Sequence, residues 1–113
     1  MPANSTELRR LTHDDLRIAY IVLAEVFHDD PEPIPAWERA DPHALATCRA
    51  CIEVEAFGVR KYRDLPSAAA KLFYSVIKLH PFPNGNKRFA LVLTLLLIIK
   101  NNRRLTAPRG LGA

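Results

Sequence analysis

The residues best suited to chemistry lie in one short stretch, HPFPNGNKR at positions 80–88. The imidazole of His80 can take up a proton near neutral pH. Gly85 lets the backbone approach a ligand without a Cβ in the way, and a helix that begins directly after it would present unpaired N–H groups to an anion. Lys87 and Arg88 would then stand in a first helical turn, where cations are disfavoured unless an anion binds there. The stretch predicts a base beside an anion site.

A base beside an anion site favours one kind of reaction. An imidazole next to bound phosphate indicates a base that activates a hydroxyl for attack on that phosphate. The side-chain oxygen of Asn84 could ligate a Mg²⁺ that bridges the phosphates. Taken singly, His80 could be a helix cap, and Lys87 and Arg88 could be solvated surface charges. All three lie in one short stretch, and the two cations there oppose the helix dipole. Such a local conflict at one place favours a functional site.

Four helices are expected to position this stretch, and no segment alternates convincingly as a strand, so the predicted fold class is all-α. The first helix begins after Thr12, where Asp15 completes a capping box, and ends at the proline-rich residues 28–35. The second begins with Asp41 as its N-cap and ends near Gly58.

The remaining two helices flank the 80–88 stretch. One opens at Pro66 and carries apolar residues at helical spacing up to His80. The other runs from about Asn86 to Lys100 and is apolar nearly all round, as expected of a central helix wrapped by others. It is too short to cross a bilayer, which needs roughly 20 apolar residues.

Length and charge limit the function classes. A chain of 113 residues predicts one domain over 1–113, with its core at about 10–105 and a flexible tail at 106–113. Three basic residues and no acid lie beyond position 100, so residues 1–100 carry 13 basic and 12 acidic residues, a net of +1 against +4 for the chain. The case for direct nucleic-acid binding is therefore weak. No signal segment is evident, which predicts a cytoplasmic protein with no membrane partner.

Cys48 and Cys51 raise the possibility of a metal or redox pair. No second pair accompanies them, and their spacing places both thiols on one helical face beside Leu45 and Ile52. Two small buried core residues is the better interpretation, and no metal is assigned to them.

The stretch HPFPNGNKR resembles the Fic/Doc motif, H-x-F-x-(D/E/N)-G-N-(G/K)-R, and residues 56–82 resemble the Doc (death-on-curing) branch of that family. The resemblance covers roughly residues 10–105. It implies a compact helical bundle of the Fido type, with a central buried helix after the 80–88 loop. It also implies transfer of part of a nucleoside triphosphate to a protein hydroxyl, with ATP and Mg²⁺ as cofactors.

The resemblance also assigns roles within the motif. His80 would deprotonate the target hydroxyl, and Phe82 would anchor the loop in the core. Asn84 stands where the family carries its Mg²⁺ ligand. The phosphates would be held by Asn84, Gly85, Asn86, Lys87 and Arg88. The catalytic set would be His80 together with Asn86, Lys87 and Arg88.

Two positions tilt the resemblance toward Doc. Lys87 replaces the glycine of typical adenylylating members, and Leu91 replaces a further arginine of their pattern. A Doc-like toxin would transfer the terminal phosphate of ATP to a Ser or Thr hydroxyl of a translation factor, elongation factor Tu by resemblance. The alternatives are an adenylyltransferase and a catalytically weak scaffold that only binds an antitoxin or nucleotide.

The sequence also bears on how the protein is inhibited and on how it docks its target. No glutamate is followed by Gly or Asn, so the self-inhibitory motif of many Fic proteins is missing. The resemblance therefore implies inhibition in trans by a Phd-type antitoxin. Residues 59–65 could form an extended flap that docks the target through Arg60 and Tyr62, although exposed loop charge explains them equally well.

Overall fold

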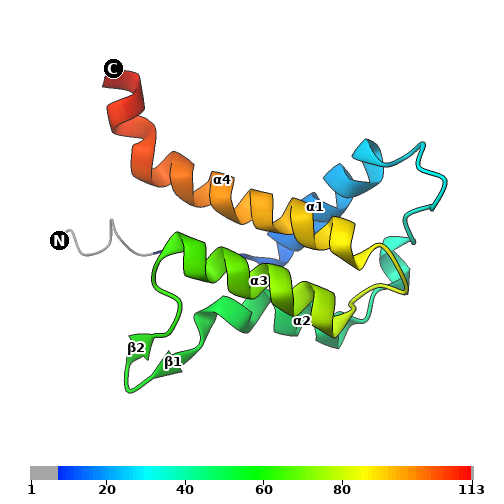
Figure 1. Ribbon diagram of the computed structural model, residues 1–113, viewed down its shortest axis with the longest axis horizontal. Helices are drawn as coiled ribbons and strands as arrows, with labels where there is room; N and C mark the ends of the chain where they lie inside the picture. Colours follow the sequence, from blue (N-terminus) through cyan, green and yellow to red (C-terminus); the bar gives the residue numbers. More distant parts are fainter. Residues whose placement is uncertain (1–7, 113) are drawn as a thin grey trace.

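The computed structural model describes residues 8–112 of the chain, and side chains up to residue 102. Within this part the fold is helical, which confirms the predicted all-α class (Figure 1). Two short 3-10 turns and a two-stranded hairpin complete it. The helices are α1 (His13–Val26), α2 (Pro42–Ala50), α3 (Leu65–Leu79) and α4 (Asn86–Gly112), the turns η2 (Trp37–Arg39) and η3 (Cys51–Glu53), and the strands β1 (Glu55–Ala56) and β2 (Val59–Arg60).

Side-chain caps start three of these helices, as local sequence chemistry predicts. Thr12 and Asp15 form a complete capping box at the start of α1. The carboxylate of Asp41 accepts hydrogen bonds from two backbone N–H groups at the start of α2. Asp64 caps α3 through the N–H of Ser67, so Pro66 occupies the second helical position rather than the first.

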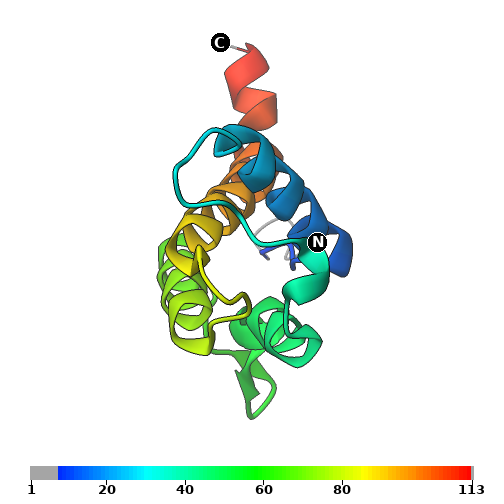
Figure 2. The same cartoon turned by 90° about the vertical axis from the view of Figure 1, so that its right-hand side faces the viewer.

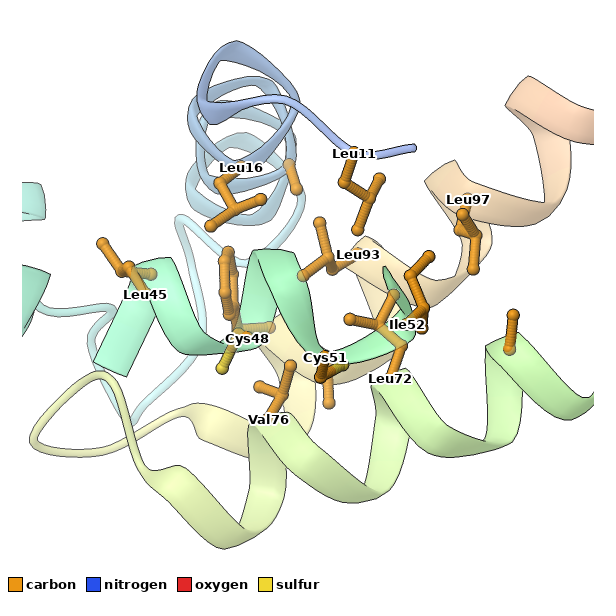
Figure 3. Packing of buried hydrophobic residues seen from close by; sticks show 14 of the residues in the cluster. Leu11, Leu16, Leu45, Cys48, Cys51, Ile52, Leu72, Val76, Leu93 and Leu97 are labelled. Atoms are coloured by element: carbon orange, nitrogen blue, oxygen red, sulfur yellow. The ribbon is translucent and has the colours of Figure 1, made fainter. Parts of the chain in front are cut away.

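The core lies where α1, α2 and α3 meet α4 (Figure 3). Cys48 and Cys51 point into it from α2 and η3, and both thiols are free and buried, which confirms their interpretation as core residues. Burial raises the pKa of Cys48 to about 12. Within the described residues, no group of three or more His, Cys, Asp and Glu side chains could hold a metal ion.

The second helix ends earlier than its sequence predicts. We expected it to reach Gly58, whereas α2 ends at Ala50 and the chain continues through η3 into the β1–β2 hairpin. Phe57 and Gly58 form the hairpin turn, both with positive φ (55° and 78°). A glycine that ends a helix and a glycine in a two-residue hairpin turn use the same left-handed backbone, so Gly58 was compatible with both.

Helix α4 is central, since it packs against both α1 and α3, but its burial is one-sided. Phe89, Leu93 and Leu97 are buried, whereas Leu91 and Leu95 are about half exposed, so the helix is not wrapped on all sides as we expected. It also continues to Gly112, well beyond the predicted end at Lys100, so most of residues 106–113, expected to form a tail, belong to this helix.

The side chains of the basic residues that account for most of the net charge lie outside the described part of the chain; they are Arg103, Arg104 and Arg109. In residues 8–112, no helix has the length and apolar character needed to cross a membrane.

Candidate active site

The predicted site is the loop between α3 and α4. His80 ends α3 in the left-handed conformation (φ 51°, ψ 62°), and its N–H donates to the carbonyl of Val76 at 3.1 Å. A histidine tolerates this conformation better than a β-branched residue does. The next carbonyl, that of Pro81, accepts a 2.8 Å hydrogen bond from the N–H of Asp41. The loop is thereby held against the start of α2.

Phe82 and Asn86 fix the shape of the loop from inside. The ring of Phe82 is buried and stacks on Tyr20 with ring centres 5.7 Å apart, and it meets Phe89 edge-on at 5.1 Å. The buried amide of Asn86 accepts from the N–H of Phe82 at 2.9 Å and donates to its carbonyl at 2.8 Å. The Asn86 side chain is thereby engaged within the loop. Only the backbone N–H of Asn86 remains for a ligand.

All residues of the 80–88 motif except Pro81 and Phe82 line one cavity of about 440 Å³, a volume typical of small-molecule sites. His80 lies on its wall with the first turn of α4, whose backbone N–H groups are unpaired donors. Lys87 is exposed there, and in the described part of the chain its ammonium makes no ion pair. The cavity is lined by Glu32, Ile77, His80, Pro83, Asn84, Gly85, Asn86, Lys87 and Arg88.

Unlike Lys87, Arg88 is already paired with carboxylates of its own chain. Its Nη1 lies 3.6 Å from the carboxylate of Asp30 and donates to the carbonyl of Glu32 at 3.0 Å, and its Nη2 lies 3.7 Å from the Glu32 carboxylate. The guanidinium also lies over the ring of Phe27, 5.5 Å from its centre. These partners belong to the connection between α1 and η2, which passes close to the start of α4 (Figure 2).

Asp30 and Glu32 were not among the residues expected at the site. They lie more than fifty positions before Arg88 in the sequence, and in a proline-rich loop they resemble ordinary surface charge. One signal was available: two cations in the first turn of a helix require an anion, and acidic residues of the same chain can supply it. The sequence pattern alone does not distinguish such an internal anion from a bound ligand.

The site offers few ligands to a metal ion. Mg²⁺ is commonly bound through one or two carboxylates together with substrate phosphates. Here Asn84 and Glu32 line the same cavity, but Glu32 is already paired with Arg88. The two residues do not form an all-protein metal cage, and the exposed amide of Asn84 is the protein ligand that fits a Mg²⁺ ion arriving on phosphates.

The predicted flap residues lie elsewhere. The guanidinium of Arg60 donates to the carbonyls of Leu8 and Ile52, and Tyr62 packs against the core, so both hold the structure together. The hairpin joins the N-terminal end of α3 (Figure 1), whereas His80 caps the other end of this helix. A helix of 15 residues is about 20 Å long. Arg60 and Tyr62 are therefore not beside the site, because the length of α3 separates them from it.

A larger cavity, of about 690 Å³, lies beside the hairpin and contains none of the motif residues. Arg60, Arg63 and Asp64 line it, together with Leu8. Leu8 directly follows residues that the structure does not describe. We therefore take the smaller cavity, which combines His80 with the start of α4, as the candidate active site.

One comparison with known proteins gives a match. The model of the family described as Fic/DOC matches residues 17–98, a range that includes the whole 80–88 loop, all of α3 and α4 as far as Ile98. No curated protein and no solved structure matches the chain.

Proposed function

Because the chain belongs to the Fic/DOC family, whose members modify proteins with groups taken from nucleotides, we propose that it transfers the terminal phosphate of ATP to a Ser or Thr hydroxyl of a protein. One observation carries this proposal. A histidine and the cationic N-terminus of a helix line the same cavity, with Lys87 free to meet an anion. A base and a phosphate site are thus within reach of one bound substrate.

In the proposed reaction the imidazole of His80 accepts the proton of the target hydroxyl. The hydroxyl oxygen then attacks the γ-phosphorus in line, the bond between that phosphorus and the bridging oxygen breaks, and ADP leaves. The N–H groups at the start of α4, together with Lys87 and Arg88, stabilise the charge on the phosphates. Mg²⁺ bound to the phosphates would neutralise part of that charge, with the Asn84 amide oxygen as a protein ligand.

We propose phosphate transfer and not AMP transfer because of the residue types at positions 87 and 91. Lys87 adds a second cation to the first turn of α4, where adenylylating members carry glycine. Leu91, which replaces their further arginine, lies half-exposed and does not line the cavity. By the same resemblance we propose elongation factor Tu as the target and a Phd-type antitoxin as the inhibitor, the arrangement of a toxin module.

The test is transfer of label to protein. The purified chain is incubated with cell extract and either γ-labelled or α-labelled ATP, with His80→Ala as the control. Because His80 is exposed, this variant should remain folded, with only a small loss of stability from alanine at a positive φ. Label from γ-ATP alone, lost in His80→Ala, is expected. Label from α-ATP would instead establish adenylylation, and nucleotide binding without any transfer would indicate an inert scaffold.

A further inference from the structure

The guanidinium of Arg88 is already engaged by carboxylates of its own chain. We propose that the 28–35 loop acts as an internal competitor for the phosphate site, so that ATP binds only after Asp30 and Glu32 have released Arg88. This inference rests on the proposed function and concerns the regulation of the same site. Its basis is the position of the two carboxylates, one at each terminal nitrogen of Arg88.

The geometry favours replacement of these carboxylates by phosphate. Both ion pairs are long, at 3.6 and 3.7 Å, whereas charge-assisted hydrogen bonds to Arg lie near 2.7–2.9 Å. Moreover, Nη2 of Arg88 is buried and has no hydrogen-bond partner among the described residues. A buried donor without a partner is costly. Phosphate oxygens would satisfy this donor better than the loop does.

The carboxylates also oppose the ligand directly. Glu32 lines the cavity with Lys87 and Arg88, so a triphosphate placed there would meet a negative charge at close range. The side chain of Glu32 is 76% exposed, so it can swing into solvent without opening the core. A closed population reduces the apparent affinity for ATP by the fraction of molecules that are open.

The loop offers a matched pair of charge changes. Asp30→Asn with Glu32→Gln removes both carboxylates from Arg88, while the backbone carbonyl of Glu32 can keep its hydrogen bond to the guanidinium. Asp29→Asn is the control, because Asp29 lies in the same loop but pairs with His28, 3.1 Å away. The ATP affinity of Asp29→Asn therefore shows the effect of removing one negative charge from this loop without changing the ion pairs of Arg88.

The experiment is calorimetric titration of the full chain with ATP and Mg²⁺. The double variant should bind roughly two- to tenfold more tightly than wild type, the effect expected of one or two partly exposed ion pairs. Asp29→Asn should bind as wild type does. Equal or weaker binding by the double variant would overturn the inference, since the carboxylates would then be neutral or would position Arg88 for the ligand.

A second measurement needs no variant. The N–H of Glu32 donates to the carboxylate of Asp30 at 2.8 Å, so its hydrogen exchange reports on the closed loop. Saturating ATP should speed this exchange in the wild-type chain, and unchanged or slower exchange would contradict the inference. If ATP binds and phosphate is transferred while both tests fail, only the inference is lost. If no variant binds ATP, the proposed function fails with it.

Discussion

Gly85 lies so close to Arg88 that a Cβ on this glycine would stand 3.1 Å from Nη2 of the arginine. Gly85 also has a positive φ of 77° and comes directly before the first residue of α4. The same residue therefore turns the chain into the helix and leaves space for the guanidinium beside the cavity. Backbone conformation and side-chain position are coupled at this point of the site.

This coupling predicts different outcomes for two glycine substitutions. Gly85→Ala and Gly58→Ala both force alanine to a positive φ, which costs about 1–2 kcal/mol of stability at either site. Nothing lies within 4 Å of a Cβ at Gly58, so only Gly85→Ala should also displace Arg88. We expect it to weaken ATP binding roughly tenfold, or ~1.4 kcal/mol. Urea denaturation and ATP titration of both variants check this, and equal affinities would contradict it.

A second pair of substitutions separates loop structure from ligand binding. Asn86→Ala leaves the buried N–H and carbonyl of Phe82 without partners and should cost about 2–4 kcal/mol of stability. Asn84→Ala removes an exposed amide and should change stability by less than about 0.5 kcal/mol. Chemical denaturation measures both. If Asn84→Ala proved as destabilising as Asn86→Ala, the assignment of the loop-fixing bonds would be wrong.

The helix starts could be predicted because their causes are local. The Thr12–Asp15 capping box and the Asp41 cap each involve residues within three positions of one another, so the sequence displays the whole interaction. The same holds for the 80–88 loop as an element between two helices. The hairpin turn at Gly58 could not be separated from a helix end, because both require the same backbone conformation.

Long-range relationships were beyond sequence reasoning. Nothing local shows that Glu32 meets Arg88, 56 positions later. Residues 89–99 of α4 are apolar nearly all round, so their sequence pattern does not identify which face is buried. The position of Tyr62 likewise depends on the length and direction of α3, which place the hairpin far from His80. The Glu32–Arg88 contact, the buried face of α4 and the position of Tyr62 are all set by tertiary packing.

The one-sided burial of α4 predicts unequal effects of the same mutation on one helix. Leu93 is completely buried, so Leu93→Ala should destabilise the fold by about 2–5 kcal/mol through lost burial and a cavity. Leu95, two positions later, is 48% exposed, so Leu95→Ala should cost less than about 1 kcal/mol. Thermal or urea unfolding compares the two. Similar losses would mean that another surface covers Leu95 in solution.

The ion pair between Asp15 and Lys100 predicts how stability depends on pH. Burial raises the pKa of Asp15, but hydrogen bonds from Lys100 and Thr12 and the charge of Lys100 outweigh this, so the pKa lies below its ordinary value of 3.8. The unfolded chain therefore binds this proton more readily than the folded one. The contribution of Asp15 is fully present above pH 3.8 and is lost as the pH falls through the lowered pKa.

Asp15→Asn tests this relationship, because it removes the charge but keeps an acceptor for the N–H of Thr12. It should lower the free energy of unfolding by about 1 kcal/mol at pH 6, the value expected of a partly buried ion pair, and by much less near pH 2. Asp14→Asn is the matched control, because Asp14 is an exposed acid in the same turn and takes no part in the ion pair with Lys100. Urea denaturation at both pH values measures the difference. If Asp15→Asn lost as much stability at pH 2 as at pH 6, the ion pair with Lys100 would not be the cause. The loss would then come from weaker capping of α1.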